Sequence, residues 1–195
     1  MTETVLARAA LYNFLAVALG EPPTAAMVRS AGKIIPGLVD APLVDLQREH
    51  TRLFVGPGEG YTPPYASIYL QAEETEKRLL WSGETAKVEV VYRAAGLEIA
   101  PGQPRVPDHL ALELQFMHHL CSRQAEALTR GEMQEAAQWQ RRQEAFLREH
   151  LFTWLPRFIA RLERYARIPF YPALAGFMLD FLQSEVENLE AFSIM

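Results

Sequence analysis

The sequence contains a single cysteine, Cys121, among its 195 residues. One cysteine excludes an intramolecular disulfide and any zinc site built from several cysteines, and it fits a reducing compartment such as the cytosol. Because Cys121 falls on an apolar helical stripe, we expect a buried, inert thiol rather than a nucleophile.

The chain also lacks a basic excess and a long apolar run. Its net charge is -5, whereas nucleic-acid-binding proteins normally present a basic surface, so we expect no nucleic-acid partner. The most apolar run, Val5 to Leu19, is interrupted by Arg8 and Asn13, is short for a membrane span and follows no basic region. We therefore expect a core helix here, no stable membrane insertion and a soluble, cytoplasmic protein.

The pattern of apolar residues is helical almost throughout, and no segment is convincing as a strand. Hydrophobic residues make up 49% of the chain, which is enough for the core of one domain. Helices are predicted at residues 4–19, 24–33, 42–55, 67–80, 85–96, 107–130, 133–151, 152–166 and 173–189. We expect one all-α domain over residues 1–195, a single-domain helical bundle of about nine helices.

Proline, glycine and hydroxyl residues set several predicted boundaries. Thr85 is the predicted N-cap, and Gly96 the predicted stop, of a helix whose valines could also suggest a strand. Pro107 stands at the favoured first position of the longest helix, which Gly131 ends. Asp108 would then lie in the first turn of that helix, where the helix dipole and free amides stabilise a carboxylate.

Two segments carry most of the functional signal. Residues 53–69, LFVGPGEGYTPPYASIY, form a loop that glycine and proline stiffen, and residues 106–117, VPDHLALELQFM, open the longest helix. The tyrosines beside Pro63 and Pro64, together with Trp81, could form a rigid surface that suits peptide capture, or they could serve packing alone.

Neither segment has the layout of a catalytic site. The loop from Gly56 to Gly60 lacks the lysine and hydroxyl pair of a phosphate-binding loop. His109 and Glu113 share a helical face, but no nucleophile and no third metal ligand accompany them. We expect no enzyme, no metal and no cofactor. One alternative is a small helical metal- or nucleotide-binding enzyme that uses Asp108, His109 and the glycine loop, and another is a structural adaptor for a different partner.

The two segments resemble the signatures of the TorD/DmsD/NarJ family of redox-enzyme maturation chaperones. These signatures are a Gly-Pro turn followed by Pro-Pro-aromatic-x-Ser-x-aromatic, and Pro-Asp-His followed by a leucine-rich helix. Residues 154–158 and 169–171 are similar to the C-terminal pattern of the family, so the resemblance covers most of the chain from about Glu49 to Leu182.

The resemblance implies an all-helical, TorD-like cytoplasmic chaperone. Such a protein binds the catalytic subunit of a molybdopterin-containing oxidoreductase and holds it for cofactor insertion before export or assembly. Many members bind the twin-arginine signal peptide of this client, and some bind its mature part. A monomer is the default expectation, while proline hinges between long helices allow a domain-swapped dimer.

Carried over by residue, the resemblance implies a client-binding site made of Pro63, Pro64, Tyr65, Ser67, Tyr69, Trp81, Asp108 and His109. The signal-binding branch often has tryptophan where this chain has Tyr65 and Tyr69, which leaves the identity of the client open. Carboxylates such as Asp108 would bind the arginines of a leader, and the tyrosine–proline surface would bind its apolar part.

Overall fold

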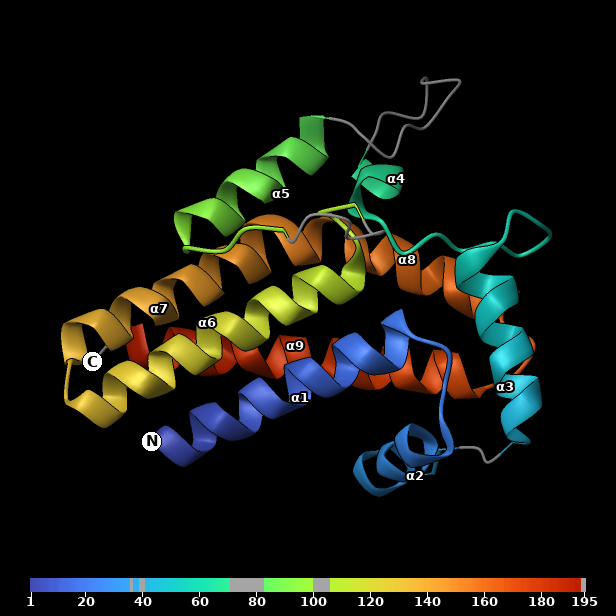
Figure 1. The fold of residues 1–195 in the computed structure, drawn as a ribbon, viewed down its shortest axis with the longest axis horizontal. Helices are drawn as coiled ribbons and strands as arrows, with labels where there is room; N and C mark the ends of the chain where they lie inside the picture. The colour runs from blue at the N-terminus through green and yellow to red at the C-terminus, as the bar shows by residue number, and fades with distance from the viewer. Residues whose placement is uncertain (36, 39–40, 71–82, 100–105, 194–195) are drawn as a thin grey trace. The chain divides into compact units, whose positions relative to one another are not determined.

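The computed structural model describes residues 1–35, 37–38, 41–70, 83–99 and 106–193, with side chains up to Leu189. Helices dominate these residues, and no strand forms among them, so the all-α prediction is confirmed. The α-helices are α1 (Thr2–Gly20), α2 (Ala25–Ile34), α3 (Leu43–His50), α4 (Ala66–Leu70), α5 (Gly83–Ala94), α6 (Leu110–Arg130), α7 (Met133–Phe146), α8 (Phe152–Tyr165) and α9 (Phe170–Ser193) (Figure 1). π-Helical turns follow α3 at Thr51–Val55 and α7 at Leu147–Leu151.

Several predicted helix ends are confirmed by their capping geometry. The Thr24 hydroxyl accepts a hydrogen bond from the Met27 amide at 3.2 Å and caps α2. Gly131, at φ 77°, ends α6 in the left-handed conformation that glycine adopts without strain. Residues 85–94 are helical rather than extended, as predicted, and Gly96, at φ 79°, lies in the turn that follows the end of α5 at Ala94.

Two predicted helix starts are wrong. The helix predicted to start at Pro107 begins at Leu110, because His109 has extended backbone angles and its side chain caps the helix. This helix, α6, has 21 residues and is not the longest, since α9 has 24. Helix α5 begins at Gly83, so Thr85 is not its N-cap but a buried residue of its first turn. Of the predicted helix at 67–80, the described residues contain Ala66–Leu70, and the remainder lies outside them.

The chain divides into two compact units. Unit 1 contains residues 1–17 and 65–154, and unit 2 contains residues 18–64 and 155–195. Each unit therefore combines two stretches that are distant in the sequence, and one of the three boundaries along the chain falls between Pro64 and Tyr65. The single domain over residues 1–195 stays a prediction.

Unit 1 is built on the antiparallel hairpin of α6 and α7 (Figure 1). An aromatic cluster joins it to α5: the ring of Phe116 lies 4.6 Å from that of Tyr92 and 4.8 Å from that of Phe146. All three side chains are buried. Since each buried aromatic ring removes a large apolar area from water, this cluster is a principal source of stability for unit 1.

A buried polar network fixes α1 against the hairpin. The Gln143 amide donates to the Gln124 carbonyl oxygen at 3.0 Å. Its own oxygen accepts from Arg8 at 2.8 Å and from the Cys121 thiol at 3.4 Å. Because a buried amide is costly unless it is hydrogen-bonded, these bonds favour one register of the three helices. Cys121 is buried, as predicted.

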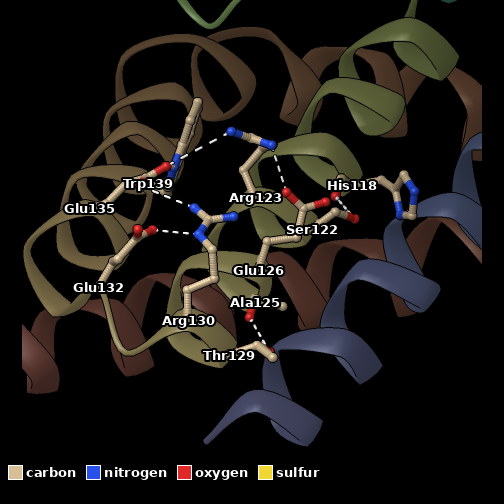
Figure 2. A network of polar contacts seen from close by, with 10 residues as sticks. All are labelled: His118, Ser122, Arg123, Ala125, Glu126, Thr129, Arg130, Glu132, Glu135 and Trp139. Carbon is tan, nitrogen blue, oxygen red and sulfur yellow. Dashed lines mark hydrogen bonds and ion pairs between the residues drawn. The ribbon is translucent and has the colours of Figure 1, made fainter.

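A second polar network lies at the surface where α6 meets α7 (Figure 2). The guanidinium groups of Arg123 and Arg142 lie over the ring of Trp139, at 5.5 and 4.6 Å from its centre. Arg123 also donates to Glu126 at 2.6 Å. Exposed ion pairs of this kind contribute little to stability.

In unit 2, the buried carboxylate of Glu49 ties α3 to the segment between α8 and α9. It accepts hydrogen bonds from the Arg52 guanidinium at 2.7 and 2.8 Å and from the Arg167 amide at 2.6 Å. Although burial opposes ionisation of this group, the hydrogen bonds from Arg52 and Arg167 outweigh it and lower the pKa of Glu49. The Tyr171 hydroxyl adds a bond to the Leu46 carbonyl at 3.3 Å.

Candidate functional site

The two sequence motifs meet within unit 1. Tyr65 and His109 form an isolated antiparallel bridge, and the Ala66 amide donates to the Asp108 carbonyl at 3.0 Å. The rings of Tyr65 and His109 are in edge-to-face contact, with their centres 4.9 Å apart. The start of α4 therefore lies directly beside the start of α6.

Asp108 joins three helices through its side chain. It is fully buried; one carboxylate oxygen accepts from the Ser67 amide at 2.7 Å and the other from the Thr85 hydroxyl at 3.3 Å. The prediction that Asp108 stabilises the first turn of its own helix is wrong, because Asp108 precedes the N-cap and binds donors of α4 and α5 instead. The Asp108 carboxylate therefore accepts its hydrogen bonds from groups of the protein itself.

His109 is the N-cap of α6. Its Nδ1 accepts a hydrogen bond from the Ala111 amide at 3.0 Å, and the residue is buried. An accepting Nδ1 carries no hydrogen, so the neutral ring holds its hydrogen on Nε2. The turn before it is fixed by the Tyr92 hydroxyl, which donates to the Pro107 carbonyl at 3.0 Å.

The other predicted site residues are less exposed than their sequence suggests. Ser67 and Tyr69 are buried, and the ring of Tyr69 stacks on that of Trp154 at 5.7 Å. Pro63 and Pro64, at the end of a stretch of unit 2, are buried, and Tyr65 is half-buried. Trp81 lies outside the described residues. Contact of these residues with a client stays a prediction, and a client would reach Tyr65 more readily than Asp108.

Glu113, which the sequence analysis noted only for sharing a helical face with His109, is a buried carboxylate in the first turn of α6. Glu113 is fully buried, with one oxygen 2.6 Å from Nε2 of His150 and the other accepting from the Trp154 indole at 3.2 Å. Burial raises the pKa of Glu113, and His150 only partly offsets this. Burial opposes protonation of His150, but the neighbouring Glu113 carboxylate outweighs it and raises the pKa of His150.

The sequence did contain a signal for this cluster. Glu113 stands three residues after Leu110 and four before Met117, on the apolar stripe of its helix. A carboxylate on a core stripe must find partners, because an unpaired buried charge is costly. His150 and Trp154, spaced four residues apart, supply them, but nothing in the local sequence identifies partners so far along the chain.

The Glu113–His150 pair predicts a fall in stability as pH rises. Both folded-state pKa values are raised, so the folded chain binds more protons than the unfolded chain, and ∂ΔG/∂pH is negative. The contribution of His150 is fully present below its unfolded pKa of about 6.5 and is lost as pH rises through its folded pKa. We expect the urea midpoint to fall between about pH 6 and pH 8 more steeply than in His150→Gln. Equal slopes would contradict the pairing.

Asp108→Ala is expected to lower the free energy of unfolding by about 2–3 kcal/mol, because the Ser67 amide and the Thr85 hydroxyl both lose their acceptor. Thr85→Val removes only the longer bond and should cost about 1 kcal/mol. Denaturant titration of the two variants checks that Asp108→Ala loses more unfolding free energy than Thr85→Val. If the Asp108→Ala variant were as stable as the unchanged chain, the Asp108 carboxylate would not hold the two motifs together.

The described residues give no support to a metal- or nucleotide-binding enzyme. Among them, no group of three or more His, Cys, Asp and Glu side chains could hold a metal ion. The glycine loop presents carbonyl groups to arginines: Arg52 donates to the Glu59 carbonyl at 3.3 Å, and Arg161 to the Tyr61 carbonyl at 2.8 Å. A phosphate cradle needs the opposite polarity, with amides directed into the loop.

No helix of the described residues combines the length and apolar character needed to cross a membrane. The described residues form an all-helical protein in which Tyr65 meets the buried Asp108–His109 motif. A family model described as nitrate reductase delta subunit matches residues 21–160. The chain belongs to this family, the TorD/DmsD/NarJ family of redox-enzyme maturation chaperones.

Curated relatives agree with this assignment. The chain is 27% identical over 155 residues to the chaperone protein TorD of Shewanella pealeana, covering 78% of this chain and 64% of the relative. It is 29% identical over 187 residues to the chaperone protein TorD of Escherichia coli O139:H28, covering 95% of this chain and 85% of the relative. The match thus spans less than two thirds of the Shewanella protein. Both relatives are named as chaperones, in agreement with the expectation that this chain is not an enzyme.

A solved structure shows the same fold. It is that of an Archaeoglobus fulgidus protein assigned to redox enzyme maturation, with a TM-score of 0.52 and 18% identity, covering 94% of this chain and 93% of the other. The likeness agrees with the all-helical fold that the described residues adopt.

Proposed function

We propose that this chain is a cytoplasmic chaperone for the catalytic subunit of a molybdopterin-containing oxidoreductase. It binds the twin-arginine signal peptide of that subunit and holds the apoenzyme for cofactor insertion before export or assembly. The observation that carries the proposal is the family match over residues 21–160, joined by relatives named as TorD chaperones.

The chemistry of the chain suits such a client. A twin-arginine leader places a basic region before an apolar one. This chain has a net charge of -5, which favours association with a basic segment. At the predicted site, Tyr65 remains half-exposed where the start of α4 lies beside the start of α6. The buried Asp108 carboxylate stabilises this arrangement through its hydrogen bonds to Ser67 and Thr85.

The direct test is a titration of the purified chain with synthetic leaders of the host's molybdopterin oxidoreductases. A scrambled leader of identical composition is the matched control, because it keeps the charge and the apolar content. We expect one leader to bind, with an affinity that falls as salt screens the arginines. Equal binding of the native and scrambled leaders would contradict recognition of a signal peptide.

A further inference from the structure

A groove of about 440 Å³ runs between α5 and α7 in unit 1. Its volume lies in the range of about 300–1,000 Å³ that is typical of binding pockets. Phe116 of α6 and Phe146 of α7 are buried beneath it. Above them, Val91 of α5 keeps 41% of its surface exposed, and the neighbouring Val90 keeps 62%. Large apolar side chains exposed along a concave surface favour a binding site.

The groove is lined by one stripe from each helix. Glu84, Val88 and Val91 follow one another on α5, with Ala95 in the turn after it, and Arg142, Phe146 and Glu149 follow one another on α7 and its π-helical extension. Successive members of each stripe are three or four residues apart, as on one face of a helix. Two parallel walls of this kind suit an amphipathic helix laid between them, with its apolar face inward.

The two ends of the groove differ in charge. Glu84 at the start of α5 acts electrostatically on His150, so the acidic residues Glu84 and Glu149 lie at the same end. Lys87 neutralises Glu84 at 2.7 Å, whereas Glu149 has no hydrogen bond or ion pair within the described residues. Arg142 lines the groove about two helical turns before Glu149.

We infer that this groove binds a basic-then-apolar segment of the client as a short amphipathic helix, with its basic residue beside Glu149. This inference rests on the proposed function and adds the site to it. A basic side chain at Glu149 forms a charge-assisted pair. The apolar turns that follow cover Val91 and Phe146. The C-terminal end of the bound helix, which carries partial negative charge, then points toward Arg142.

The groove, rather than the Asp108–His109 motif, provides the surface for the apolar part of the client. Asp108 and Tyr69 are buried, whereas Val91 is open to solvent. The motif instead fixes the position of α5 through the Thr85–Asp108 bond, and so sets one wall of the groove. This division of roles predicts different effects for the two sets of variants: Asp108 variants lose stability, and Val91 variants lose binding.

Val91→Glu tests the groove. It places a charge against the apolar face of the client, and we expect binding of the leader to weaken about tenfold or more while the fold is kept. Val17→Glu is the matched control, because Val17 also lies on a helix, is also 41% exposed and does not line the groove. Glu149→Gln should weaken binding by a smaller factor and reduce its salt dependence, whereas Glu163→Gln on α8 should change neither.

A photo-crosslinking residue at position 91 identifies what occupies the groove. We expect a crosslink to the leader of a co-expressed client. A crosslink to a second copy of this chain, or to a segment of the same chain, would overturn the inference. If the unchanged chain and the Val91→Glu variant bound the leader equally well, the inference about the groove would also be overturned, and the proposed function would stand. Failure of the unchanged chain to bind any client would contradict both.

Discussion

Replacing Glu113 with alanine is expected to lower the free energy of unfolding by about 3–5 kcal/mol, the usual cost of removing one partner from a buried pair. Both carboxylate oxygens of Glu113 are used, by His150 at 2.6 Å and by the Trp154 indole at 3.2 Å. The variant leaves both partners without this acceptor in a buried site, and it leaves a cavity on the core stripe of α6. Urea unfolding followed by far-ultraviolet circular dichroism measures the loss.

Two variants of the same helix make this result specific. Glu113→Gln keeps an oxygen that can accept from Trp154 and an amide that can bond to neutral His150, so it should retain most of the stability. Glu126→Ala removes an exposed carboxylate paired with Arg123 (Figure 2) and should change the free energy of unfolding by less than about 1 kcal/mol. A Glu113→Ala loss no larger than that of Glu126→Ala would contradict the buried pair.

Trp154→Ala is expected to cost about 3–5 kcal/mol of unfolding free energy, because it opens a large cavity in the core of unit 1. Trp154 is fully buried, and its ring stacks on Tyr69. The substitution also removes the indole donor to Glu113. Thermal and urea unfolding should both show the loss, and Tyr69 should become more accessible to solvent, as fluorescence quenching can report.

Trp139 provides the control for this prediction. Trp139 lies half-buried at the surface, with the guanidinium groups of Arg123 and Arg142 over its ring, so Trp139→Ala should cost much less than Trp154→Ala. Trp154→Phe keeps one aromatic ring but loses the indole donor and part of the buried volume, so its cost should be smaller than that of Trp154→Ala. Equal losses for Trp154→Ala and Trp139→Ala would mean that Trp154 is not a core residue.

Local sequence signals predicted most helices of this chain. Thr24, Gly96 and Gly131 mark helix ends because their backbone or side-chain requirements are satisfied locally. The same reasoning misplaced the start of α6 by three residues, since proline at position 107 is compatible with either a first turn or the turn before it. His109 decides the start, and histidine is not a residue normally associated with that role.

The candidate site was predictable only in part. The two motifs were identified as segments, and the structure brings them together at Tyr65 and His109. Their internal bonding was not predictable, because Asp108 binds donors that lie 41 and 23 residues away along the chain. The Glu113–His150–Trp154 cluster and the α5–α7 groove depend likewise on tertiary packing, which no local pattern specifies.

The most direct test of the proposed chaperone function is a co-expression pull-down. The bait is this chain, and the prey are the host's molybdopterin-dependent catalytic subunits, each produced with and without its N-terminal leader. We predict that one subunit is captured and that removal of its leader abolishes capture. Capture that does not depend on the leader would place the contact on the enzyme body, and no capture of any molybdopterin subunit would contradict the proposed chaperone function.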